Sequence, residues 1–158
     1  MTVLSHLGED GRARMVDISG KPDTLRVAEA GANLVCAPET LAAVRAGRTP
    51  KGAVIATAEL AGIMAAKRTA ELIPMCHPLA LTKAAVTIEI DDALPGFRIR
   101  SEARTIGPTG LEMEALTAAS VAALTLYDML KAIDRGMRVT DVRLLAKTGG
   151  QSGDWSAE

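Results

Sequence analysis

The segment that decides the fold is AVTIEIDDALPGFRIRSE, residues 85–102. In its first part Val86, Ile88 and Ile90 alternate with small or polar residues, and the same alternation resumes from Phe97. A period of two on both sides of a Pro-Gly turn predicts a β-hairpin with one buried face and one polar face. The polar face carries four charged side chains: Arg98, Arg100, Glu102 and Arg104.

The chain before the hairpin predicts one strand and two helices. Residues 25–35 are apolar enough for a strand. Pro38 opens a short helix that Gly47 ends, because proline suits a first helical position and glycine follows a last one. An Ala-rich second helix is predicted from about residue 58 to 73, where Pro74 stops it.

After the hairpin, the sequence predicts a long helix and a last strand. The loop GPTG at 107–110 opens the helix, which runs from about 111 to 135 and ends before Gly136. Between residues 115 and 126 this helix is apolar or small almost all round. Such a helix is buried on more than one side, so we expect another subunit to cover part of it. Residues 139–146 form the last strand.

The order strand, helices, hairpin, helix, strand predicts an α+β fold. It matches the ferredoxin-like split βαβ arrangement, with an antiparallel sheet and an additional helix. The 158 residues fit one domain. We expect its ends, residues 1–17 and 148–158, to be flexible.

Composition excludes several classes of protein. The formal net charge is −1, without the basic excess of a generic nucleic-acid binder. No stretch approaches the roughly 20 apolar residues of a membrane span. Cys36 and Cys76 match neither a disulfide framework nor a zinc spacing, so we expect no metal, no cofactor and a cytoplasmic setting.

Two short motifs carry candidate binding residues. Met75, Cys76 and His77 lie between two prolines, which fix the backbone and so aim the side chains; a tight turn with a surface histidine is the simpler interpretation. Glu112 and Glu114 begin the long helix, where acids also complement the helix dipole. Two carboxylates would repel a phosphate, but they suit an N–H-rich edge such as that of guanine or a pterin.

Acid–base chemistry is predicted at the other end of the long helix. Asp128 and Lys131 are neighbours on its surface, either as an ordinary exposed ion pair or as a catalytic pair beside an apolar stretch. Further cations near Gly- or Ala-rich segments could together hold a polyphosphate. They are Lys51, Lys67, Arg68 and Lys147.

Several long motifs in one order resemble the cyclic pyranopterin monophosphate synthase family of molybdenum-cofactor biosynthesis, the MoaC proteins. The likeness covers roughly residues 14 to 155. The matching runs are MVD (15–17), PETL (38–41), AGIMAAKRT (61–69), ELIPMCHPL (71–79), TGLEMEALT (109–117), AALTLYDM (122–129) and KTGG (147–150).

The resemblance implies a lyase of the phosphorus-oxygen class. Such enzymes convert 3′,8-cyclo-7,8-dihydroguanosine 5′-triphosphate to cyclic pyranopterin monophosphate and release pyrophosphate. Asp128 would be the principal acid/base, with Lys131 beside it. The family forms hexamers, built as trimers of dimers, with the pocket at a subunit interface. By the same resemblance, the substrate-binding residues would be Met75, Cys76, His77, Met113, Glu114, Glu112, Lys51, Arg26, Lys67 and Lys147.

This chain departs from the family pattern at two positions. Pro50 stands where many members have lysine before Lys51, and Gln151 stands at another common lysine. Both departures bear on how many cations hold the triphosphate. One alternative function is a non-catalytic, ligand-sensing ferredoxin-like module, in which Asp128 and Lys131 would be dispensable. An RNA-binding domain of RRM type is rejected because Phe97, the hairpin's aromatic, belongs to the buried set.

Overall fold

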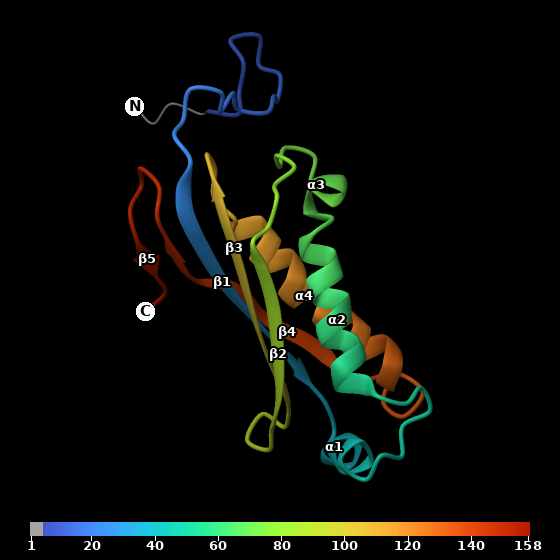
Figure 1. The fold of residues 1–158 in the computed structure, drawn as a ribbon. Coiled ribbons are helices and arrows are strands. Elements are labelled where there is room, and N and C mark those ends of the chain that lie inside the picture. Colours follow the sequence, from blue (N-terminus) through green and yellow to red (C-terminus); the bar gives the residue numbers. More distant parts are fainter. Residues whose placement is uncertain (1–4) are drawn as a thin grey trace.

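A computed structural model describes residues 5–158 as one sheet with helices on one of its faces (Figure 1). Residues 1–4, part of the predicted flexible arm, lie outside the described residues. The helices are α1 (Pro38–Arg45), α2 (Val54–Ala66), α3 (Thr69–Leu72) and α4 (Glu112–Leu130). The strands are β1 (Thr24–Val35), β2 (Lys83–Asp91), β3 (Gly96–Gly107), β4 (Arg138–Thr148) and β5 (Trp155–Ser156).

The strands form one antiparallel sheet in the order β2-β3-β1-β4-β5. Helices α2 and α4 lie side by side against one face of it, with α4 over β1 and β3 and α2 over β2 (Figure 1). This arrangement confirms the predicted α+β, ferredoxin-like fold with its antiparallel sheet.

The hairpin of β2 and β3 is confirmed, and its alternation fixes the register. Ile88 pairs with Ile99, and Ile90 pairs with Phe97. Phe97 is fully buried, as the alternation predicts, while Arg98 and Arg100 are exposed on the opposite face. A shift of the pairing by one residue would turn the apolar set toward solvent, so the pattern specifies this register strongly.

Small side chains let α4 approach its neighbours closely. Half of its buried positions are alanine, and α4 packs against both the sheet and α2. A β-carbon added at Gly62 of α2 would lie 2.8 Å from the carbonyl oxygen of Ala118 on α4. Burial on more than one side is therefore confirmed within a single chain, and coverage of α4 by another subunit stays a prediction.

Two predicted helix boundaries are wrong. The helix expected over 58–73 is two helices, because α2 ends at Ala66 and α3 begins at Thr69. The Thr69 hydroxyl donates to the carbonyl oxygens of Ala65 (3.3 Å) and Ala66 (3.0 Å), so it occupies acceptors at the break. The long helix ends at Leu130, well before residue 135.

The loop after α4 contacts the start of α1. After Leu130 the chain turns, and the Asp134 carboxylate accepts hydrogen bonds from the backbone N–H of Ala37 (2.9 Å) and the hydroxyl of Thr40 (3.2 Å). Asp134 thereby satisfies the backbone N–H of Ala37, the residue that precedes α1 and whose own side chain makes no capping hydrogen bond. The loop and the short helix are held together by this carboxylate.

The C-terminal segment turns back along β4. Gly149 and Gly150 have φ angles of 87° and 81°, which only glycine adopts easily, and β5 then pairs with Ala146 and Lys147. The predicted flexibility of residues 148–158 stays a prediction. Helix α4 is long and apolar enough to cross a membrane by length and composition, and half of that segment is buried inside the fold.

Candidate functional site

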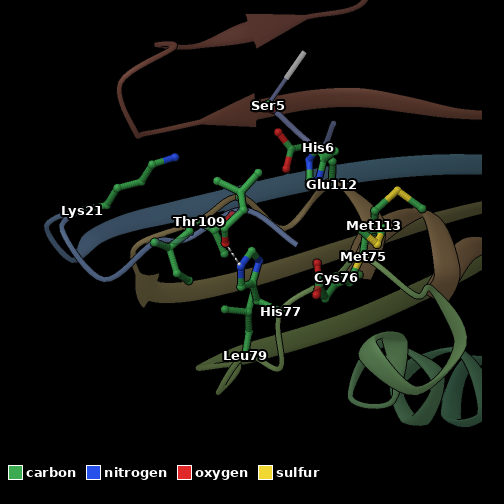
Figure 2. A pocket seen from close by; sticks show the side chains of 14 residues that line it. Ser5, His6, Lys21, Met75, Cys76, His77, Leu79, Thr109, Glu112 and Met113 are labelled. Atoms are coloured by element: carbon green, nitrogen blue, oxygen red, sulfur yellow. Dashed lines mark hydrogen bonds between the residues drawn. The ribbon is translucent and has the colours of Figure 1, made fainter. Parts of the chain in front are cut away.

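A hollow of about 310 Å³ lies between the α3–β2 loop, the start of α4 and the N-terminal arm (Figure 2). The structure brings both predicted motifs together here. The predicted residues that line it are Met75, Cys76, His77, Glu112, Met113 and Glu114. The two methionines bring polarisable, adaptable side chains, which suit contact with a planar ring.

His77 is tied to the N-terminal arm. Its Nε2 donates a hydrogen bond of 2.6 Å to the carbonyl oxygen of Val16, so that nitrogen carries a proton in this arrangement (Figure 2). The turn that presents His77 is closed by the backbone N–H of Cys76, which donates to the carbonyl of Ile73 at 3.1 Å. The imidazole therefore has a fixed orientation, with Nδ1 left for a ligand.

Two carboxyl groups face the hollow in different environments. Glu114 is only 5 % exposed, whereas Glu112 is partly exposed and lies 3.2 Å from the Lys147 ammonium. Burial raises the pKa of Glu114 above its ordinary value, and the nearby Glu112 charge adds to the effect. A buried carboxyl group of this kind is costly to the fold and is typical of a functional site.

Cys76 does not have the environment of a nucleophile. Burial, and then the charge of Glu114, raise the pKa of its thiol. The thiolate is the reactive form of cysteine, so this setting keeps Cys76 protonated at neutral pH. The arrangement favours a role for Cys76 as a wall of the hollow.

A second hollow, of about 280 Å³, adjoins the first and is lined by cations. Arg26 is held by hydrogen bonds from Nε to the carbonyl of Gly107 (3.0 Å) and from Nη2 to that of Pro108 (3.2 Å). Lys147 donates to the Ser152 hydroxyl at 2.9 Å. Gln151 also lines this hollow, so the departure from lysine there removes one positive charge from it.

Gly150 lies against the Arg26 guanidinium. A β-carbon at this position would lie 2.2 Å from Nη1 of the guanidinium. The tip of this side chain can move, so the need for glycine in the KTGG motif comes from the positive φ angles of Gly149 and Gly150. It comes also from the backbone carbonyl oxygen of Leu25, which would lie 2.2 Å from a β-carbon added at Gly149.

The predicted acid–base pair lies elsewhere, at the far end of α4. The Asp128 carboxylate is 2.7 Å from the Lys131 ammonium and 2.6 Å from that of Lys51. The hydrogen bond from Lys131, and then that from Lys51, lower the pKa of Asp128 to about 2. Asp128 and Glu114 are separated by fourteen helical positions, which corresponds to about 21 Å along the helix axis.

The sequence prediction included four residues that line neither hollow: Asp128, Lys131 and Lys51, which form the cluster at the far end of α4, and Lys67. Lys67 is exposed at the end of α2 and lines neither hollow, so its role stays a prediction. The prediction missed several residues of the first hollow: Ser5, His6, Val16, Ile18 and Lys21 in the N-terminal arm before β1, and Leu79, Thr109 and Gly110 beside the predicted motifs. The arm has no periodicity, and only the MVD run at 15–17 in the family motifs pointed to it.

No group of three or more His, Cys, Asp or Glu side chains is placed to hold a metal ion within residues 5–158. The prediction that no metal takes part stays a prediction.

Comparisons with known proteins agree on one family. The profile of the MoaC family matches residues 15–150. A protein of Methylobacterium sp. (strain 4-46), named cyclic pyranopterin monophosphate synthase, is 58 % identical over 158 residues, covering 100 % of this chain and 99 % of the relative. A protein of the same name from Nostoc sp. (strain PCC 7120 / SAG 25.82 / UTEX 2576) is 57 % identical over 152 residues, covering 96 % and 90 %.

Proposed function

Because the chain belongs to the MoaC family, we propose that it is a cyclic pyranopterin monophosphate synthase of molybdenum-cofactor biosynthesis. It converts 3′,8-cyclo-7,8-dihydroguanosine 5′-triphosphate to cyclic pyranopterin monophosphate and pyrophosphate, and so is a lyase. The observation that carries the proposal within the structure is the pair of adjoining hollows, one with carboxyl groups and one with cations.

The first hollow suits the base of this substrate. Glu112 and Glu114 offer acceptors for the N–H groups along one edge of a guanine or pterin ring. Met75 and Met113 offer apolar contact to its face. His77, oriented by Val16, presents Nδ1 to exchange a proton with the ring during its rearrangement.

The second hollow suits the phosphates. Arg26 and Lys147 provide charge-assisted donors, which bind phosphate oxygens more strongly than neutral donors do. The paired Lys147 and Glu112 can separate when an anion arrives, because the phosphate competes with the carboxylate for the ammonium.

We propose that the working site is shared between two subunits. Asp128 is about 21 Å and Lys131 about 25 Å along the axis of α4 from Glu114, too far to meet the same small molecule within one chain. A second copy that brings its Asp128 cluster to the two adjoining hollows would complete the site. Exposed apolar side chains support an oligomer: Leu60 and Met64 on α2, Leu124 on α4, and Leu25 and Ile106 on the sheet. The proposed assembly is the hexamer of the family, a trimer of dimers, and the proposed compartment is the cytoplasm.

Substrate binding would also activate Asp128. With a pKa of about 2 it is ionised but a weak base, since its charge is stabilised by Lys131 and Lys51. A triphosphate that draws these two lysines toward its own oxygens would withdraw that stabilisation. The pKa of Asp128 would then rise toward a range in which the carboxylate accepts protons during turnover.

The test is pyrophosphate release from freshly prepared substrate. Wild type is expected to release it, and Asp128→Asn and Lys131→Ala are expected to lose nearly all of the activity. Lys83→Ala is the matched control, because Lys83 also forms an exposed ion pair, 3.0 Å from Glu102, and lines neither hollow. Binding without release by a correctly assembled wild type would refute the synthase and favour the ligand-sensing module.

A further inference from the structure

The two hollows share one wall. Four residues line both of them: Lys21, Thr109, Gly110 and Glu112. The hollows are therefore two ends of one trough, and this wall is the junction between its carboxyl-lined end and its cation-lined end. Lys21 is the one positively charged side chain among the four.

Lys21 is presented by a preformed turn. Its backbone N–H donates to the carbonyl of Ile18 at 3.0 Å, and the Asp17 carboxylate accepts from the N–H and hydroxyl of Ser19 at 2.9 and 2.6 Å. Pro22 follows and restricts the backbone of Lys21 to extended conformations. Figure 2 shows Lys21 among the residues that line the first hollow, on the side away from Met75.

The same segment is attached to the base-binding hollow. Val16, one residue before Asp17, accepts the hydrogen bond from His77. The position of the turn that carries Lys21 is thus set by the imidazole that faces the other hollow.

Lys21 also has an ammonium free for a ligand. Arg26 is engaged by two carbonyls, and Lys147 by Glu112 and Ser152. Within residues 5–158, Lys21 makes neither an ion pair nor a side-chain hydrogen bond, and it is exposed to solvent. A phosphate can therefore pair with the Lys21 ammonium without displacing another partner of that side chain.

We propose that Lys21 is a further substrate-binding residue, which contacts the α-phosphate at the junction of the two hollows. The inference rests on the proposed function. In a nucleoside triphosphate the α-phosphate lies between the nucleoside and the two outer phosphates. With the base beside Glu114 and the outer phosphates beside Arg26 and Lys147, the α-phosphate falls at the shared wall.

The α-phosphate is the group on which the phosphoryl chemistry takes place. A substrate hydroxyl oxygen forms a bond to the α-phosphorus, and the bond from that phosphorus to the oxygen bridging to the β-phosphate breaks. Pyrophosphate leaves with the bonding electrons, and the hydroxyl proton passes to a base. Negative charge grows on the α-phosphoryl oxygens in the transition state, so a cation placed there assists the reaction more than it assists ground-state binding.

The experiment compares Lys21→Gln with Lys21→Arg and with Lys83→Gln as the control. For each variant kcat and KM for pyrophosphate release are measured, together with the inhibition constant of added pyrophosphate. We expect Lys21→Gln to lower kcat by roughly 10- to 100-fold, while Lys21→Arg keeps most of the activity. Pyrophosphate inhibition is expected to change less than about twofold, because the product contacts Arg26 and Lys147 instead.

The three results that would contradict the Lys21 proposal can be told apart. An active wild type whose kcat is unchanged by Lys21→Gln overturns the role of Lys21 and leaves the synthase intact. A loss of pyrophosphate inhibition as large as the loss of kcat would place Lys21 on the leaving group and overturn the α-phosphate assignment. A wild type that releases no pyrophosphate refutes the proposed function itself, and the Lys21 assignment with it.

Discussion

A site shared between subunits can be tested by mixing two inactive variants. Asp128→Asn disables the cluster at the far end of α4, and Glu114→Gln disables the carboxyl-lined hollow. Loss of a hydrogen bond to a charged group costs about 1.5–3 kcal/mol, so Glu114→Gln should weaken substrate binding by roughly 10- to 100-fold. Each variant alone is therefore nearly inactive at low substrate concentration.

The recovery expected on mixing follows from the geometry. In a twofold dimer that pairs the hollow of one subunit with the Asp128 cluster of the other, a mixed dimer has one site with both parts intact and one with both parts altered. Random association of equal amounts makes half of the dimers mixed. About a quarter of all sites are then intact, and about a quarter of wild-type activity should return.

The assay is pyrophosphate release after the two variants are unfolded together in urea and refolded. A mixture of Asp128→Asn with Lys131→Ala is the matched control. Both changes lie in the same cluster, so no pairing of these subunits rebuilds an intact site. If mixed oligomers form, as native mass spectrometry can establish, and no activity returns, the shared site is refuted. Recovery in the control mixture would refute it equally.

Three further results follow from single residues. Lys131→Ala should raise the pKa of Asp128 from about 2 toward 3.8, because it removes the hydrogen bond from Lys131, which is the largest cause of the lowered value. Carbon NMR of the Asp128 carboxyl group measures this pKa, and an unchanged value would contradict the contact. Glu114→Gln should raise the melting temperature at pH 7, because burial raises the pKa of the Glu114 carboxyl in the folded state and its ionisation therefore destabilises the fold. The gain in melting temperature should shrink as the pH falls toward 4.5, the ordinary pKa of glutamate. A gain that stays constant with pH would point to another cause. Gly62→Ala should cost about 1–3 kcal/mol in urea unfolding, because its β-carbon would lie 2.8 Å from the carbonyl oxygen of Ala118; unchanged stability would exclude that close crossing.

The sheet could be predicted from sequence because its pattern is local and strict. Alternation in residues 85–102 fixed both the hairpin and the buried side of Phe97. The break between α2 and α3 could not be predicted in this way, because Lys67 and Arg68 are ordinary helix formers. The loop after α4 is attached to the start of α1 by the Asp134–Ala37 hydrogen bond, a contact across 97 positions that no local pattern contains.

The same distinction applies to the site: residues grouped in a motif could be predicted, and an isolated residue could not. The motifs around His77 and Glu114 were found because several polar residues stand together in each, and the structure brings the two motifs to one hollow. Lys21 was missed because it stands alone in a segment without periodicity. Its place depends on the turn closed by Asp17 and on the bond from His77 to Val16, which form only in the folded chain.

The single tryptophan lies in β5, where Trp155 pairs with Lys147 and is 46 % exposed. Indole emission therefore reports on the C-terminal hairpin beside the cation-lined hollow, and the aromatic-poor interior contributes little to it. Trp155 is therefore an intrinsic fluorescence probe beside the proposed phosphate contacts. Quenching of the Trp155 emission, or a shift of its maximum, on adding tripolyphosphate would report occupancy of that hollow without a label. Unfolding of the alanine-rich core is better followed by circular dichroism.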